Sequence, residues 1–62
     1  MDPEIQTEIC DLFKLRNEHA LISQTEVCVF HLAEATTVEA HIDVFLKIDA
    51  IINQALRLQL EV

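Results

Sequence analysis

The stretch VEAHIDVFLKIDAIINQALRLQL, from Val38 to Leu60, decides the fold of this 62-residue chain. It contains neither Gly nor Pro, so nothing inside it interrupts a helix. Directly before it, Thr36-Thr37-Val38-Glu39 matches a capping box, in which side chains at the helix start satisfy free backbone N–H groups. The sequence therefore predicts one uninterrupted helix of about six turns over residues 37–60.

A helical wheel at 100° per residue divides this segment into two surfaces. One narrow polar stripe contains Glu39, Asp43, Lys47, Gln54, Arg57 and Glu61. Apolar residues fill roughly two-thirds of the circle, although a surface helix needs an apolar stripe of only ~100°. One neighbouring helix of a hairpin covers only one side of that arc, so the other side needs a second chain or a partner protein.

The residues before this segment also form helical patterns. Asp2, Pro3 and Glu4 are typical of a helix start, because a carboxylate caps free N–H groups and Pro3 has no N–H. Apolar residues then recur at steps of three and four, which predicts a helix over residues 3–22. Ser23-Gln24-Thr25-Glu26 is a second capping-box match, so a further helix over residues 24–35 either begins there or continues the first. Its apolar stretch Val27–Phe30 is interpreted as a buried helical segment.

These patterns predict a single all-α domain covering residues 1–62. A chain without Gly and with one Pro lacks the residues that the tight turns of a β fold require. A core this small supplies only ~3–5 kcal/mol. We therefore expect a helical hairpin, with its first helix continuous or broken near Ser23 to give three helices, that self-associates into a dimeric four-helix bundle. In length and helix layout this resembles small plasmid-encoded RNA-loop-binding hairpin dimers and small bacterial antirepressors; the resemblance implies no residue roles.

Composition restricts the environment of the protein. There is no basic-then-apolar signal peptide, and no apolar run is long enough for a membrane span. Only two cysteines, Cys10 and Cys28, are present, whereas secreted domains of this size usually carry at least four. We expect a cytoplasmic protein without a membrane interaction. The formal charge of −7 favours a protein partner, particularly a basic one.

The main functional hypothesis is a protein–protein interaction module: a homodimeric regulator or inhibitor that binds another protein of unknown identity. The chain is also expected to bind itself, as a homodimer or a higher oligomer. The expected interface consists of Val38, His41, Ile42, Phe45, Ile48, Asp49, Ile52, Leu56 and Gln59. Asp49 lies on the apolar side of the last helix and Arg16 on that of the first. The two are interpreted as a buried ion pair that fixes register, or Asp49 contacts a partner in a groove.

Two alternative functions depend on other residues. A nucleic-acid-binding regulator would use Lys14 and Arg16, although scattered cations on an acidic chain make nucleic acid an unfavourable partner. A metal-binding regulator would use Cys28, His31 and His41, yet the paired spacings of zinc motifs are absent. We therefore expect no metal site, no cofactor and, because no catalytic motif is present, no enzymatic activity.

Overall fold

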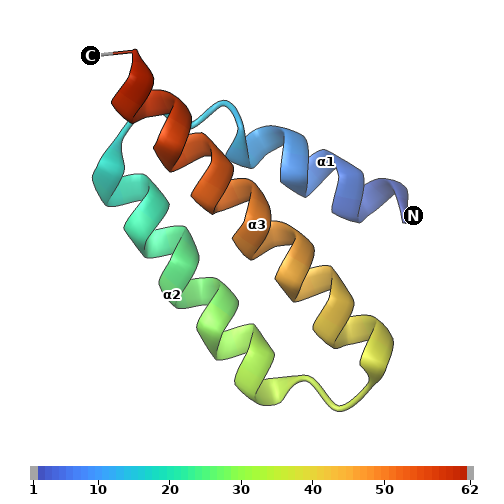
Figure 1. The fold of residues 1–62 in the computed structure, drawn as a ribbon. Helices are drawn as coiled ribbons and strands as arrows, with labels where there is room; N and C mark the ends of the chain where they lie inside the picture. The colour runs from blue at the N-terminus through green and yellow to red at the C-terminus, as the bar shows by residue number, and fades with distance from the viewer. Residues whose placement is uncertain (1, 62) are drawn as a thin grey trace.

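The computed structural model describes residues 2–61, which form three α-helices joined by short connections (Figure 1). Helix α1 spans Pro3–Leu12, α2 spans Glu18–Glu34 and α3 spans Val38–Leu60. Within the described residues there is no strand, so the expected all-α fold is confirmed. None of the three helices is both long enough and apolar enough to cross a bilayer.

Each helix begins with a side chain that caps free backbone N–H groups. The Asp2 carboxylate accepts a hydrogen bond from the Glu4 N–H, and Pro3 occupies the first helical position. The Thr37 hydroxyl accepts from the N–H of Ala40 at 3.1 Å, so the N-cap of α3 is Thr37, one residue later than the Thr36 of the expected capping box. Asn17 caps α2 and accepts from the N–H of His19 at 2.7 Å.

Of the two alternatives for the first half of the chain, the structure has the one with three helices, but the expected first helix over residues 3–22 and the break near Ser23 are wrong. The helix α1 ends at Leu12, the chain turns through residues 13–17, and Ser23 lies inside α2. The capping box at Ser23 is not used, since α2 continues through this position and the Thr25 hydroxyl donates to the Leu21 carbonyl within the helix. The Asn17 cap starts α2 earlier, and the turn lets Leu12 and Leu21 both pack into the core.

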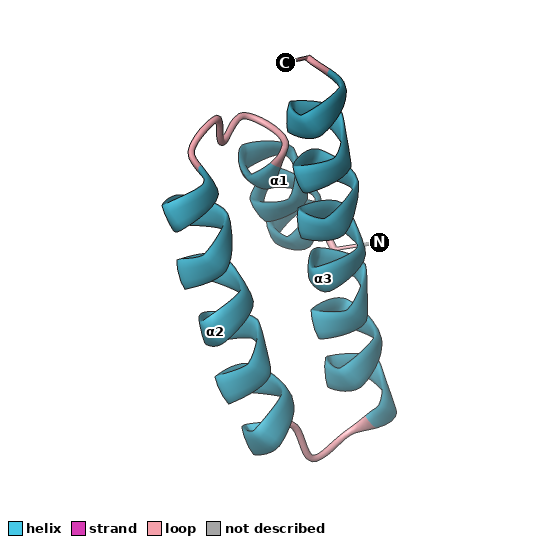
Figure 2. Cartoon of the chain, turned by 60° about the vertical axis from the view of Figure 1, so that its left-hand side comes forward, coloured by secondary structure: helices cyan, strands magenta, loops and turns pink. Residues whose placement is uncertain are grey.

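Helix α3 is the central element: Figure 1 shows α1 and α2 on either side of it, and both pack on α3 rather than on each other. Figure 2 shows the connections at the two ends of α2, one to α1 and one to α3. The core is a small cluster contributed by all three helices: Leu12, Leu21, Cys28, Val44, Ala50 and Ile51. The expectation that the segment Val27–Phe30 is buried is wrong for all but Cys28, since Val27, Val29 and Phe30 are exposed. Four consecutive residues of a helix point to different sides. Because α2 packs mainly on α3, only one of the four side chains is covered.

The polar stripe of α3 contacts α1 and the connection that follows it. Lys47 Nζ lies 2.7 Å from a Glu8 carboxylate oxygen of α1, and only 16% of the Lys47 side chain is exposed. Gln54 is buried, and its side-chain amide donates to the Leu15 carbonyl. Two side chains of the predicted polar stripe therefore hold α1 and the connection after it against α3.

Polar side chains at the end of α3 also contact the connection that follows α1. The guanidinium of Arg57 lies 5.0 Å from the centre of the Phe13 ring, a cation–π contact. Arg16 forms an ion pair with Glu61. The expected ion pair between Arg16 and Asp49 is therefore wrong, because the turn after α1 places Arg16 beside the last turn of α3.

Candidate functional site on the outer side of α3

A row of mostly apolar side chains runs along the outer side of α3. We call it the α3 stripe, and its members are Val38, Ile42, Phe45, Asp49, Ile52, Leu56 and Gln59. They follow one another at alternating steps of four and three residues, which is the spacing of the a and d positions of a coiled-coil heptad. A helix with this spacing presents a continuous seam to a second helix.

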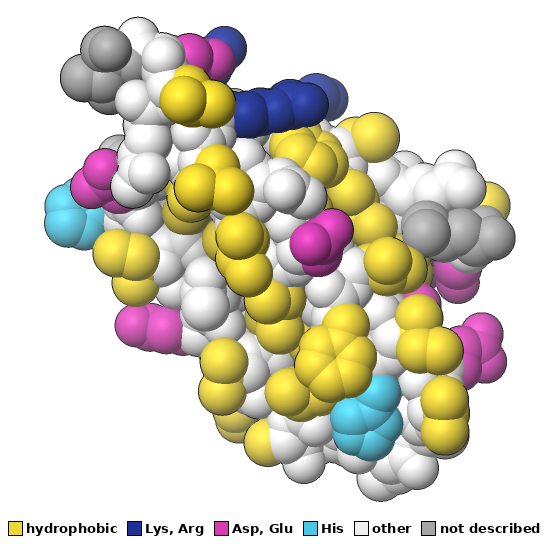
Figure 3. Space-filling model, viewed as in Figure 1, with side chains coloured by type: hydrophobic (Ala, Val, Ile, Leu, Met, Phe, Trp, Pro, Cys, Tyr) yellow, Lys and Arg dark blue, Asp and Glu magenta, His cyan; other side chains and the backbone are white. Residues whose placement is uncertain are grey.

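The apolar members of the stripe are left uncovered by the fold. Their exposed fractions range from 52% for Ile42 to 77% for Val38. Figure 3 shows hydrophobic side chains in a row across this side of the molecule. Single exposed apolar residues are ordinary, but a contiguous row of them marks an interaction surface.

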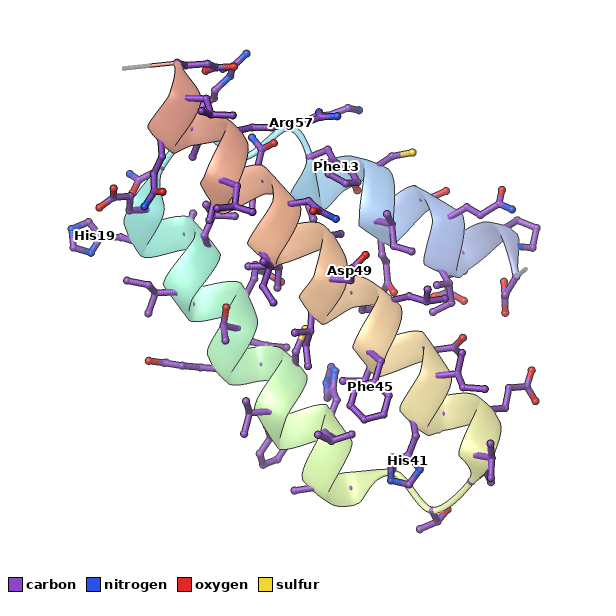
Figure 4. All side chains as sticks on the ribbon, in the orientation of Figure 1. Phe13, His19, His41, Phe45, Asp49 and Arg57 are labelled. Atoms are coloured by element: carbon purple, nitrogen blue, oxygen red, sulfur yellow. The ribbon has the colours of Figure 1, made fainter. Side chains whose placement is uncertain are left out.

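The stripe points away from α1. Asp49 and Lys47 are two residues apart, which places them about 200° apart around the helix. Lys47 contacts α1, so the stripe lies on the opposite side of α3 from α1. Figure 4 shows His41, Phe45 and Asp49 along this outer side.

Asp49 is the one charged member of the stripe. It is exposed and lies among Phe45, Ile52 and Leu56 in the heptad order. Its contact is a hydrogen bond from the Asn53 side-chain amide at 3.3 Å. The four cations of the chain have other contacts: Lys14 with Asp11, Arg16 with Glu61, Lys47 with Glu8 and Arg57 with Phe13. No salt bridge to Asp49 occurs within residues 2–61.

The exposed apolar surface extends from α3 onto α2. A groove of about 410 Å³ lies between the two helices and is lined by Ile22 of α2 and by Ile52, Ala55 and Gln59 of α3. Ile52 and Gln59 belong to the α3 stripe, so the groove opens on its side. Val29 is seven residues after Ile22 and therefore lies on the same side of α2, and both side chains are more than half exposed.

The structure divides the nine expected interface residues into two groups. The seven members of the α3 stripe lie on its exposed outer side, whereas His41 and Ile48 are partly buried. A His41 ring nitrogen lies 2.7 Å from the Thr37 carbonyl, and Ile48 packs against the core. Sequence reasoning missed Ile22 and Val29 of α2, whose heptad separation was the available signal.

The residues considered for metal and nucleic-acid binding are not brought together as sites. Cys28 and His31 line a groove of about 270 Å³ between α1 and α2, whereas His41 is hydrogen-bonded at the start of α3. No group of three or more His, Cys, Asp or Glu side chains suited to a metal occurs in residues 2–61. Lys14 and Arg16 each pair with a carboxylate, which lowers the positive potential that phosphates require.

The two cysteines differ in environment, which gives a testable difference in reactivity. Cys10 is exposed and Cys28 is buried, and both are free thiols. Burial raises the pKa of the Cys28 thiol, with a smaller opposing effect from Lys47 and a further increase from Glu8. Because the thiolate is the reactive form, we expect Cys10 to be alkylated by iodoacetamide at pH 8 at least tenfold faster than Cys28. Mass spectrometry of timed samples measures this ratio, and equal rates would show that the core around Cys28 is open.

Comparisons with known proteins provide no family: no protein-family model, no curated protein and no solved structure matches this chain.

Proposed function

We propose that this protein is an interaction module: a small regulator or inhibitor that binds another protein and forms a homodimer through the α3 stripe. One observation carries the proposal. The fold uses the polar stripe of α3 to hold α1 and leaves a heptad-spaced apolar row exposed on the opposite side. A monomer gains nothing from that exposure, whereas a second helix on the row removes the apolar side chains from water.

The α3 stripe continues onto α2, which enlarges the apolar surface that a second copy can cover. The stripe and the α2–α3 groove beside it lie on the same side, so helices α2 and α3 of two copies would form a four-helix bundle. This arrangement also covers Ile22 and Val29.

Charge and thiol content support the type of partner and its environment. A net charge of −7 gives each protomer a negative field, which favours a basic protein partner through faster association. Both cysteines are free, as expected in a reducing cytoplasm. The ion pairs of Lys14 and Arg16 lend no support to nucleic-acid binding, so the protein partner is the proposal favoured here.

Replacing Ile52 with lysine tests the homodimer. Ile52 is 53% exposed, so the change is expected to leave the helical content of the monomer intact while placing two charges in the seam of the dimer. Sedimentation equilibrium at micromolar concentrations should give a dimer mass for the wild type and a monomer mass for Ile52→Lys, with the same circular dichroism at 222 nm.

Ser23→Lys is the matched control, because it adds the same charge at an exposed position inside α2, away from the α3 stripe. This variant should remain dimeric. A monomeric wild type, or a dimer that Ile52→Lys does not dissociate, would contradict the assignment of the α3 stripe as the interface.

A further inference from the structure

We infer that the protein partner binds the α3 stripe through an amphipathic helix that carries an arginine or lysine at the heptad position opposite Asp49, and that it displaces the second copy. The inference rests on the proposed function and specifies the chemistry of its partner. Three observations support it: the position of Asp49 in the stripe, the lack of a cation opposite it in a second copy, and the acceptor oxygens of Asp49 and Asn53.

A second copy of α3 that is aligned along the stripe leaves the Asp49 carboxylate without a cation, whether the two helices run parallel or antiparallel. Asp49 is the fourth of the seven stripe members, so it lies at the middle of the seam. In a parallel pair it lies opposite its own copy, and in an antiparallel pair a d position such as Phe45 or Ile52 lies opposite it. A carboxylate that is buried without a cation costs free energy, so the homodimer is weakened at its centre.

The rest of the chain does not offer a cation for this position. Lys47 and Arg57 of α3 contact Glu8 and Phe13 on the side that holds α1. Helix α2, which borders the stripe, contains no Lys or Arg, and the groove between the helices is bordered by Glu18. A second copy therefore adds negative charge beside Asp49, whereas a partner with one cation in its seam compensates it.

The polar atoms beside Asp49 suit a guanidinium. Asn53 donates its amide N–H to the Asp49 carboxylate, which leaves the Asn53 carbonyl oxygen free to accept. The two side chains lie one helical turn apart and together present several acceptor oxygens within the apolar row. Arginine has five donors in a fixed planar arrangement and loses less hydration energy than lysine, so we expect arginine to bind more tightly.

Four synthetic peptides test the inference against the full-length protein. All cover residues 37–61 of this chain, so they carry the same stripe: one is unchanged, and the others carry Asp49→Arg, Asp49→Leu or Asp43→Arg. The Asp49→Arg and Asp43→Arg peptides have the same net charge, but Asp43 belongs to the polar stripe of the helix. Fluorescence anisotropy of labelled peptides measures each Kd.

We expect the Asp49→Arg peptide to bind the wild-type protein at least tenfold more tightly than the Asp43→Arg peptide. With the protein variant Asp49→Asn this preference should fall to less than threefold, because the carboxylate is absent. The inference would be overturned if the two arginine peptides bound with equal affinity, or if the preference persisted in the Asp49→Asn variant. In either case, binding of the unchanged and Asp49→Leu peptides would still support the stripe as an interface. Failure of all four peptides to bind would overturn the proposed function as well.

Discussion

Replacing Ile51 with alanine is expected to unfold the monomer, whereas the same replacement at the adjacent Ile52 is expected to leave it folded. Ile51 is 5% exposed and belongs to the core, while Ile52 is 53% exposed on the α3 stripe. Removing a buried isoleucine side chain costs ~2–5 kcal/mol. A chain of this size has a free energy of unfolding of only about 3–5 kcal/mol, so the loss at Ile51 is comparable with the total stability of the monomer.

Urea denaturation followed at 222 nm checks this difference. Titrations at several protein concentrations separate the stability of the monomer from the contribution of the dimer, because only the latter depends on concentration. The two variants carry the same change in side-chain volume and helix propensity, so each is the control of the other. Equal losses of monomer stability at the two positions would contradict the assignment of α3's inner and outer sides.

Replacing Asp49 with leucine is expected to tighten the proposed homodimer about 100-fold, because two carboxylates leave the seam and each is estimated to cost ~1.4 kcal/mol when buried without a cation. Leucine also fills an a position of the heptad with an apolar side chain. The dimer dissociation constant from sedimentation equilibrium measures the change.

Glu39→Leu is the control for Asp49→Leu, because it removes one negative charge and adds an apolar side chain on α3 outside the stripe. Its dissociation constant is expected to change less than threefold. If Asp49→Leu left the dissociation constant unchanged, Asp49 would lie outside the seam, and the partner chemistry inferred from it would lose its basis.

The extent of α3 could be predicted from the sequence because its determinants are local. Thr37 caps its start, and no Gly or Pro interrupts it. The boundary between α1 and α2 could not be predicted in the same way. Two local signals compete there, the Asn17 cap and the capping box at Ser23, and packing of Leu12 and Leu21 on α3 decides between them. That packing is a long-range property of the fold.

The candidate site was predictable to the extent that it depends on spacing along one helix. The wheel led to an expected interface that contains all seven members of the α3 stripe, but also His41 and Ile48, which are partly buried. It also identified the polar stripe, but not what the stripe contacts. The Arg16–Glu61 ion pair joins residues 45 positions apart, and no local pattern indicates such a pairing. Self-association and the identity of the partner stay predictions.

The way in which α1 is attached has a consequence for the order of folding. Helices α2 and α3 are joined by a three-residue connection, so their pairing is local in sequence and can form early. Helix α1 buries only Leu12, has Ile9 partly buried against the core and adds the Glu8–Lys47 ion pair, so it packs on α3 less extensively than α2 does. It is therefore the unit that docks last and opens at the lowest free energy. An opened α1 exposes Lys47 and Gln54, to which the α1 of a second copy could dock by domain exchange.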